Sequence, residues 1–489
     1  MNKKVGIIGS GFAGLSAACY LAKSGNEVFI FEKNSSPGGR ARQLKLSGFT
    51  FDMGPSWYWM PDVFEQFFAH FDKKPSDYYE LIRLDPSYRV KFKDENIDVP
   101  ASMQEMEALF ESYEPGTAKN LQKFLAQAEY KYQVGINDLV HKPSRSVTEF
   151  MNIKLLQGLL KMDVFTSMSK HIRKFFRHEK LIELLEFPVL FLGSTPENTP
   201  ALYSLMNYAD ISLGTWYPKG GMYKVVEGMV SLAESLGVKI MYDEAVTGFT
   251  FTENHIETIQ TVKGEYPIDI IVAGADYHHV EQHLLPKEYR IYSEKYWQSR
   301  TMAPSSLLFY IGVDKVLPNM KHHVLFFDED FKQHAHEIYN DPKWPTKPLL
   351  YTSATSKTDN TVAPEGHENL VVLIPVAPGL VDDEANREKY YNLVMDRLED
   401  FTGTNIRDHV VCKKSFAHND FIADYNSFRG NAYGLANTLL QTAILKPSLK
   451  NKKLNNLYYT GQLTVPGPGV PPSIISGEVV AKEIAKDFK

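Results

Sequence analysis

The chain has 489 residues, 43% of them hydrophobic and 23% charged, which is the composition of a globular protein large enough for two or three domains. Its formal net charge of −6 argues against nucleic-acid binding, because no global basic field would attract a polyanion. The two cysteines, Cys19 and Cys412, are too few for a disulfide framework or a zinc site. We therefore expect no metal and a reducing, cytoplasmic compartment.

No apolar run reaches the roughly 18 residues of a membrane-spanning helix, and the apolar run within Met1–Ile8 is too short for a signal peptide. The chain opens instead with a predicted strand at Lys3–Ile8. This strand leads directly into Gly9–Gly14, which has the spacing G-x-G-x-x-G. A helical pattern follows, and then a second strand, Glu27–Phe31, which ends at Glu32.

Each part of this opening segment has a physical role. Gly9 permits a tight turn, Gly11 lets the backbone approach a pyrophosphate, and Gly14 lets the helix pack close to the sheet. The helix N-terminus presents free N–H groups to phosphates. Glu32 can accept hydrogen bonds from ribose hydroxyls, and it would repel the 2′-phosphate of NADP. The segment therefore predicts a dinucleotide site.

Further elements follow along the chain, each with a clear local pattern. They are a hairpin-like segment at Leu44–Phe51, a helix at Val225–Leu236 capped by Gly237, strands at Val238–Ile240, Ala245–Phe251 and Asp269–Gly274, a strand at Leu457–Thr460, a Pro/Gly-rich loop at Val465–Pro472 and a last helix from near Ser473. Between them, Asp85–Gly214 is predicted to be mostly helical from about Ser102. The segment Leu284–Asn451 has strand-like runs at Leu307–Val313, Val324–Phe327, Leu349–Ala354 and Leu370–Val376, followed by a helix at Asp382–Phe401.

These patterns predict an α/β protein with a discontinuous Rossmann-like domain made of residues 1–83, 216–282 and 454–489. Residues 85–214 would form a helical part, and residues 284–451 a substrate domain with a mixed sheet.

Four sequence blocks carry a resemblance that covers essentially the whole chain. They are Gly9–Gly14 with Glu32 and Gly38-Gly39-Arg40; Phe51–Ser56 with Met60–Phe64; Gly220-Gly221-Met222 with Ala273–Asp276 and His279; and Leu457–Gly461 with Gly467–Pro471. Through these blocks the chain resembles the bacterial-type phytoene desaturases, a carotenoid-modifying branch of the FAD-dependent amine oxidase superfamily. Gln462–Val465 and the extra proline in Gly469–Pro472 depart from the family pattern and leave the substrate open.

The resemblance implies a glutathione-reductase-type FAD domain, in which Arg40 neutralises the pyrophosphate. The residues that it assigns to FAD are Gly9, Gly11, Ala13, Gly14, Glu32, Lys33, Gly39, Arg40, Gly54, Pro55, Ser56, Val246, Gly461, Gln462 and Val470.

It also implies desaturation of a long polyene, by hydride transfer to flavin N5 and loss of a proton, with oxygen or a quinone as electron acceptor. The substrate would be phytoene-like, or a carotene or hydroxycarotenoid desaturated at the 3,4 position. No catalytic base is assigned, because Asp276, His278 and His279 are more simply a turn with a helix cap. The run Trp57–Trp59 would either line an apolar tunnel or fill the core.

Residues 151–180 hold seven Lys or Arg and two acids, interleaved with leucine and phenylalanine. This pattern predicts a basic amphipathic helix on a membrane surface, so that the protein would be cytoplasmic and peripherally membrane-bound. The alternative is a solvated helix packed on its own core.

Two other functions share this expected fold. An amine oxidase would also use FAD, although many attach it through a C-terminal cysteine that this chain lacks. A non-catalytic prenyl- or polyene-binding protein, such as a GDP-dissociation inhibitor of prenylated GTPases, would not need the intact glycine loop, Glu32 and Arg40.

Overall fold

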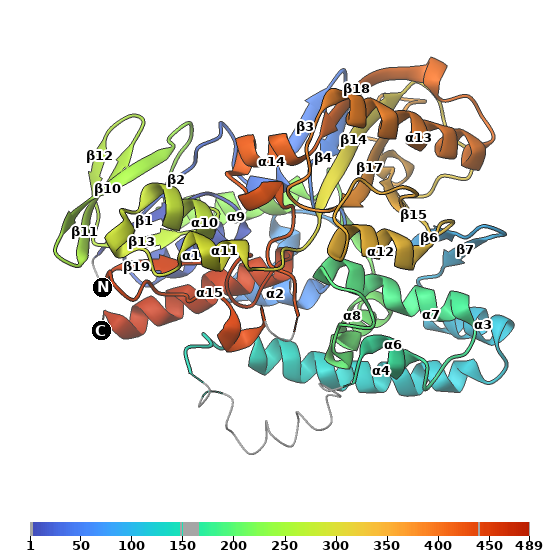
Figure 1. The fold of residues 1–489 in the computed structure, drawn as a ribbon, viewed down its shortest axis with the longest axis horizontal. Helices are drawn as coiled ribbons and strands as arrows, with labels where there is room; N and C mark the ends of the chain where they lie inside the picture. The colour runs from blue at the N-terminus through green and yellow to red at the C-terminus, as the bar shows by residue number, and fades with distance from the viewer. Residues whose placement is uncertain (1–2, 147–148, 150–165, 439–440, 489) are drawn as a thin grey trace.

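A computed structural model describes residues 3–146, 149, 166–438 and 441–488. The protein has a mixed α/β fold with two main sheets, and a layer of helices lies below them in the view of Figure 1. Both chain ends lie on the side of the smaller, parallel sheet. The expected α/β class is confirmed.

The parallel sheet holds five strands in the order β19-β13-β1-β2-β9. They are Leu457–Tyr459, Ile270–Ala273, Lys4–Ile8, Glu27–Phe31 and Lys239–Met241. Helices α1 (Phe12–Lys23), α2 (Pro61–Ala69), α9 (Tyr223–Ser235) and α15 (Val470–Asp487) contribute to one apolar core with this sheet. Its opposite face is covered by the antiparallel strands β10 (Val246–Thr252), β11 (His255–Thr261) and β12 (Glu265–Pro267).

The predicted elements of this region form with small shifts of their ends. The hairpin consists of β3 (Gln43–Leu46) and β4 (Phe49–Asp52). Gly237 follows helix α9 with φ +86°, as a helix-ending glycine does. The last helix begins at Val470 rather than near Ser473, because Pro471 and Pro472 fit the first helical turn, where an N–H is not needed.

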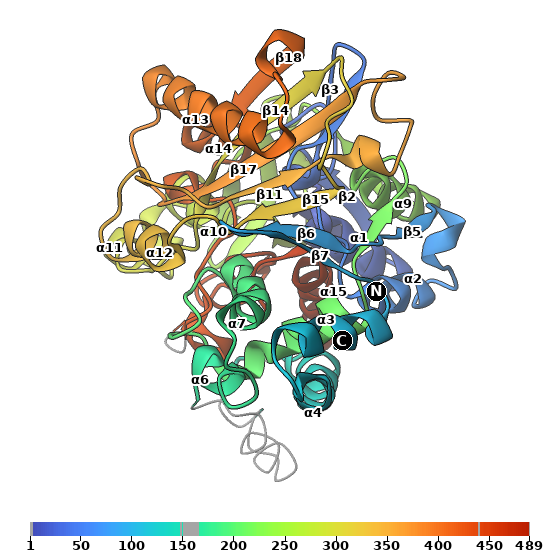
Figure 2. The ribbon, with the colours of Figure 1, turned by 90° about the vertical axis from the view of Figure 1, so that its right-hand side faces the viewer.

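The second sheet has seven strands in the order β18-β14-β17-β16-β15-β6-β7. They are Val410–Phe416, Ser305–Val313, Glu368–Val376, Leu350–Ser353, His323–Phe326, Tyr88–Lys91 and Asn96–Val99. All its pairings are antiparallel except that of β15 with β6. Figure 2 shows the sheet between α13 (Glu384–Thr402) and α14 (His418–Tyr425) above and the lower helices below. A short ribbon of β5 (Leu81–Arg83) and β8 (Trp216–Pro218) lies beside it.

The lower layer contains α3 (Met103–Tyr113), α4 (Thr117–Val134), α6 (Met168–Ile172), α7 (Glu179–Glu186) and α8 (Leu205–Asn207). Much of the expected amphipathic helix at 151–180 lies outside the described residues. Its described part is not one helix, since α6 ends at Ile172 and α7 begins at Glu179. Phe176 is buried in the lower core, and Arg173 forms an exposed ion pair with Glu179 at 2.9 Å.

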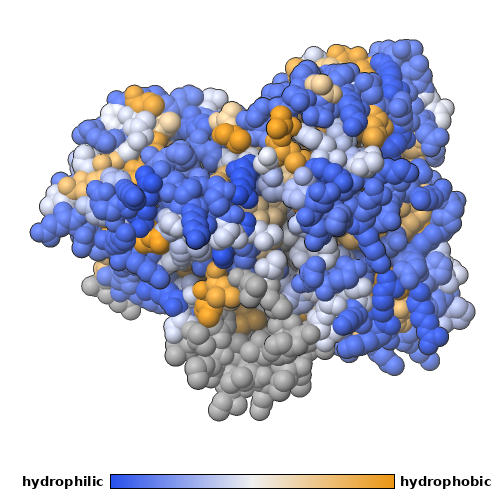
Figure 3. Space-filling model, in the orientation of Figure 1, coloured by the Kyte–Doolittle hydropathy of each residue, from blue (hydrophilic) through white to orange (hydrophobic). Residues whose placement is uncertain are grey.

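The face drawn in Figure 3 is mostly hydrophilic, with hydrophobic residues in small separate patches. Within the described ranges, no helix combines the length and the apolar character needed to cross a bilayer.

Candidate functional site

One large cavity lies where the loops of the parallel sheet meet the mixed sheet. Its volume is about 500 Å³, within the roughly 300–1,000 Å³ that is typical of ligand sites. The glycine loops line one end, and side chains of the mixed sheet, of α12 (Phe331–Tyr339) and of the lower helices line the other. The cavity therefore connects the glycine loops and the mixed sheet through one continuous space.

The glycine turn after β1 is shaped by its backbone. Gly9 has φ +93°, and its N–H donates to the Phe31 carbonyl at 2.9 Å. A Cβ on Gly11 would meet nothing within 4 Å, so the cavity is open directly above this residue. A Cβ on Gly14 would lie 2.1 Å from the Gly9 carbonyl oxygen. Gly14 does not line the cavity and instead allows α1 to begin close against the turn.

Glu32 holds this turn in place as well as lining the cavity. One carboxylate oxygen, Oε2, accepts hydrogen bonds from the Ser10 backbone N–H at 2.9 Å and from the Ser10 hydroxyl at 2.6 Å. The other, Oε1, accepts from the Asn34 N–H at 2.9 Å. The buried carboxylate thus ties the loop after β2 to the glycine turn at the cavity wall.

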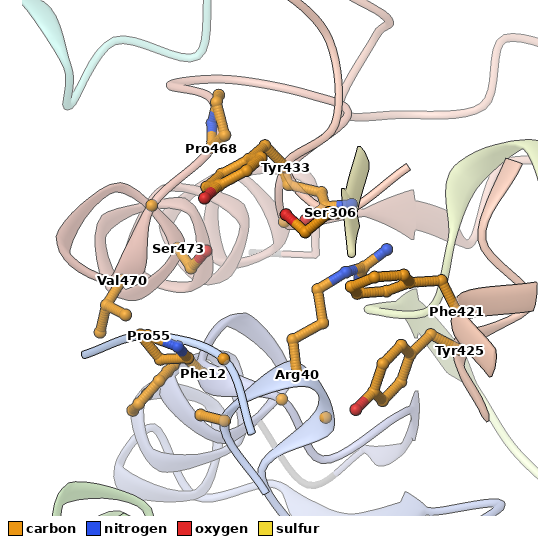
Figure 4. A pocket seen from close by; sticks show the side chains of 18 of the residues that line it. Phe12, Arg40, Pro55, Ser306, Phe421, Tyr425, Tyr433, Pro468, Val470 and Ser473 are labelled. Carbon is orange, nitrogen blue, oxygen red and sulfur yellow. The ribbon is translucent and has the colours of Figure 1, made fainter. Parts of the chain in front are cut away.

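Arg40 lies between the glycine turn and α14, with its side chain toward Phe421 and Tyr425 (Figure 4). A Cβ on Gly54 would lie 2.2 Å from the Arg40 carbonyl oxygen, so only glycine lets the two loops approach this closely. The guanidinium carbon lies 5.2 Å from the centre of the Tyr425 ring. These contacts fix Arg40 at the cavity wall.

The guanidinium of Arg40 lacks a carboxylate hydrogen-bond partner among the described residues. Its Nη2 donates to the Ser427 hydroxyl at 3.1 Å and the Asn431 carbonyl at 3.4 Å, while its Nε is shielded from solvent and makes no hydrogen bond there. In the amide orientation that satisfies its neighbours, Gln462 accepts from Nη2 at 3.0 Å. Burial lowers the pKa of Arg40, opposed by the charge of Asp276. A cation held this way needs an anionic group in the cavity.

Asp276 is the helix cap expected from the sequence. Its carboxylate accepts from the His279 N–H at 3.1 Å and from the Phe428 N–H at 3.3 Å. His278 contacts Glu294 at 2.9 Å, away from the cavity that His279 lines. Burial lowers the pKa of His279 to about 4, so this ring is neutral near pH 7.

The C-terminal block completes the cavity between its two ends. The Gly461 N–H donates to the Ser476 hydroxyl at 3.0 Å, which holds the loop after β19 against α15. The start of α15 at Val470 points into the cavity (Figure 4). Because Pro471 and Pro472 carry no N–H, this helix end offers fewer free donors than an ordinary N-terminus.

The other end of the cavity is apolar. Its walls are Trp57, Trp59, Phe187, Met206, Leu308, Leu325, Phe327, Phe331, Ala335, Ile338, Leu349, Leu350 and Leu373, with Tyr339 and Tyr351 among them. The acids that line the cavity in the described residues, Glu32, Asp276 and Asp424, all lie at the glycine-loop end. No described carboxylate therefore faces this apolar end to receive a cationic substrate.

His334 also lines the apolar end, but both ring nitrogens are engaged. Nε2 donates to the Pro375 carbonyl at 2.8 Å, and Nδ1 accepts from the Leu349 N–H at 3.1 Å. Burial lowers its pKa to about 4. His334 is thus a structural residue of the wall rather than a free base.

The three residues of the aromatic run Trp57–Trp59 do not share one role: two line the cavity and one fills the core. Trp57 and Trp59 line the cavity, and Trp57 stacks on His323 with ring centres 4.1 Å apart. Tyr58 points the opposite way, is fully buried and stacks on Phe64 in the core of the parallel sheet. In an extended segment successive side chains point to opposite sides, so Trp57 and Trp59 face the cavity while Tyr58 faces the core.

Apart from Gly14, every residue expected at the cofactor lines this cavity. They are Gly9, Gly11, Ala13, Glu32, Lys33, Gly39, Arg40, Gly54, Pro55, Ser56, Val246, Gly461, Gln462 and Val470.

The flavin containing amine oxidoreductase family matches residues 12–485 of the chain. A carotenoid 3,4-desaturase from Haloarcula japonica is 42% identical over all of this chain and 99% of its own length. A 4,4'-diapophytoene desaturase from Staphylococcus aureus is 32% identical, with 99% of both chains covered. The chain belongs to the carotenoid desaturases of this flavoprotein family. An oxidoreductase from Methanosarcina mazei shares the fold, with a TM-score of 0.64 at 15% identity over 98% of this chain and 100% of that one.

This carotenoid desaturase family member is an FAD-dependent oxidoreductase, and its cavity fits the cofactor. The space above Gly11, the α1 N-terminus and the Nε of Arg40, which no described residue hydrogen-bonds, together suit a pyrophosphate. Gly39 would place a Cβ 3.4 Å from the Gly11 Cα, so the two glycine loops meet at this point. Glycine is favoured at position 39 by its backbone, which has φ +54°.

Several residues of the desaturase site carry no signal in the sequence. Phe421 and Tyr425 on α14, Ser427 and Asn431 after it, and Tyr433 surround Arg40 or line the cavity. They come from a segment with an ordinary helical pattern, almost four hundred residues after Arg40. Only the tertiary fold brings them to the site.

Proposed function

We propose that the protein is an FAD-dependent carotenoid desaturase that introduces carbon–carbon double bonds into a long polyene. The observation that carries this proposal is the single cavity with a glycine-loop end and an apolar end free of described acids. FAD bound at the glycine loops supplies the acceptor for the hydrogens removed from adjacent carbons.

Residues at one end of the cavity bind the cofactor, and residues at the other end bind the polyene. At one end, Gly9, Gly11 and the α1 N-terminus hold the pyrophosphate, Arg40 balances its charge and Glu32 accepts from the ribose. At the other end, the leucine and aromatic walls bind and orient the polyene and exclude water. No catalytic base is assigned, since the ring nitrogens of His334 are both hydrogen-bonded.

Within this function, we propose 3,4-desaturation of a carotene or hydroxycarotenoid over desaturation of phytoene. The support is the higher identity to the 3,4-desaturase, 42%, than to the diapophytoene desaturase, 32%. Oxygen or a quinone takes the electrons from the reduced protein.

The domain boundaries expected from the sequence are part of the proposal. Residues 1–83, 216–282 and 454–489, which supply all five parallel strands, form the glutathione-reductase-type FAD domain. Residues 284–451 form the substrate domain, to whose sheet the 85–214 segment adds β6 and β7. The helices of that segment face a membrane, with the protein otherwise cytoplasmic.

The test is expression in cells that accumulate phytoene, lycopene or γ-carotene. We expect a red-shifted carotenoid from lycopene or γ-carotene, with a mass lower by two hydrogens. Absence of a shift with all three would contradict desaturation. In parallel, the purified protein should form no hydrogen peroxide with a panel of amines, whereas peroxide formation would favour an amine oxidase.

A further inference from the structure

Two neighbouring apolar side chains project from a short turn near the C-terminus. Ile444 and Leu445 are 40% and 48% exposed, and together we call them the apolar tip. They follow Ala443, whose φ of +47° is unusual for a residue with a side chain. The other exposed large hydrophobic residues of the described chain are isolated in sequence: Tyr130, Val262, Val316, Val381, Val411 and Ile422. The tip is therefore an unusual concentration of exposed apolar surface.

A surface notch adjoins the apolar tip, with Ile444 in its wall. Its basic side chains are Arg145, Lys446, Lys450, Lys452 and Lys453, and no acid is among the described residues that line it. We call it the basic notch. In a chain of net charge −6, five cations around one depression make a local positive field.

Three of these five cations form no ion pair among the described residues. Lys446 is buried and donates to the Asn437 side-chain carbonyl at 3.0 Å, and Lys453 donates to the Glu288 backbone carbonyl at 2.8 Å. Lys452 is exposed and forms no ion pair within the described residues. The other two are compensated, because Arg145 pairs with Glu483 at 2.7 Å and Lys450 with Asp487 at 2.8 Å. Of the three, Lys452 and Lys453 are exposed, so their charge reaches solvent beside the apolar tip.

The basic notch and the substrate cavity lie on two sides of one stretch of chain. Leu463 lines the cavity, and Val465, two residues later, lines the notch. Anything that covers the notch therefore lies next to the cavity.

We propose that the apolar tip and the basic notch together form the docking surface for an anionic phospholipid bilayer. The side chains of Ile444 and Leu445 insert among the acyl chains, and the exposed Lys452 and Lys453 of the notch bind lipid phosphates. This inference rests on the proposed function, because a polyene substrate dissolves in a bilayer and must pass from it to the cavity.

The test is flotation of the FAD-loaded full chain with vesicles of phosphatidylcholine alone or with phosphatidylglycerol. We expect binding to the anionic vesicles that weakens with salt. Ile444→Ser/Leu445→Ser and Lys452→Glu/Lys453→Glu should each reduce it at least about tenfold. Val381→Ser/Val411→Ser and Lys389→Glu/Lys414→Glu, which change exposed residues in or beside α13 and β18, are matched controls that should bind as wild type.

Flavin content and turnover of detergent-dispersed polyene separate this inference from the proposed function. Docking variants should retain both and lose turnover only of polyene embedded in vesicles. The docking surface is overturned if the wild-type protein does not bind anionic vesicles. It is also overturned if the tip and notch variants bind them as well as the control variants do. Neither result would contradict desaturation. If the wild-type protein does not turn over the detergent-dispersed polyene, the proposed function itself is overturned.

Discussion

At the scale of single residues, Arg40 determines how the cavity receives an anion. Its carbonyl packs on Gly54, its guanidinium stacks on Tyr425, and its Nε has no partner among the described residues. Its neighbour Arg42 differs, since it forms an ion pair with Asp424 and lies outside the cavity lining. The two arginines provide a natural comparison within one loop.

We predict that Arg40→Gln weakens FAD binding by about ten- to a hundredfold, the effect of losing one hydrogen bond to a charged group. The measurement is the FAD bound per chain after dialysis, with titration of the apoprotein. Arg42→Gln is the control and should retain FAD. Equal retention by both variants would show that Arg40 does not carry the pyrophosphate charge.

A second residue of interest is Asp210, which is buried in the helical part. Its carboxylate accepts from the Tyr88 hydroxyl at 2.8 Å and the Thr215 hydroxyl at 3.2 Å. The Thr215 oxygen also accepts from the indole N–H of Trp59 at 2.8 Å, and Trp59 lines the apolar end. Burial raises the pKa of Asp210 to about 7, opposed by these hydrogen bonds and by Arg83.

This pKa predicts a pH dependence of stability with a definite sign. Unfolded aspartate ionises near pH 4, so the folded state binds one more proton between about pH 4 and 7. The free energy of unfolding therefore falls as pH rises through that window, by on the order of 4 kcal/mol for this group. Asp210→Asn should flatten the Tm profile there.

The control is Asp62→Asn, which also loses a carboxylate that accepts from a tyrosine, Tyr132 at 2.7 Å, but at a half-buried site. Comparison of the two Tm profiles separates the loss of the buried carboxylate from the loss of a hydrogen bond to tyrosine. A slope unchanged in Asp210→Asn would mean that Asp210 is already ionised in the folded protein at low pH.

At the scale of elements, α12 forms one wall of the apolar end. Phe331, Ala335 and Ile338, at helical spacing, line the cavity, while His336 on the same helix is exposed. The helix thus presents one face to the cavity and the other to water.

We predict that Ala335→Phe fills the cavity and lowers polyene turnover at least tenfold, since overpacking a cavity wall displaces the ligand rather than the distant FAD loops. Turnover and flavin content are measured side by side. His336→Phe adds a ring on the solvent face and should turn over like wild type. Loss of FAD together with turnover in Ala335→Phe would refute the separation of the two ends.

Elements with a strong local pattern were predicted well from the sequence. The glycine turn, the hairpin before Gly54 and the strands β14–β17 follow from turn residues and apolar runs. The start of α15 was placed too late because two prolines resemble a loop, although proline suits a first helical turn. The proposed helix at 151–180 was wrong in its described part, where charged residues separate two short helices rather than follow one face.

At the scale of the whole molecule, the long-range pairings could not be predicted. β6 joins β15 in parallel, although more than two hundred residues separate them. The cavity walls on β14 and β17 look like core in the sequence, because both faces of these strands are buried. One face packs under α13, and the other includes Leu308 and Leu373 at the cavity.

The central claim is that one cavity brings FAD and a long polyene into contact. The most direct measurement is the flavin absorbance of the purified protein under anaerobic conditions, after addition of detergent-dispersed lycopene or γ-carotene, with the carotenoid product analysed by mass. The account predicts bleaching of the flavin and a product lighter by two hydrogens, with no bleaching by amines. A flavin that is bleached by an amine, or that stays oxidised with every carotenoid, would contradict it.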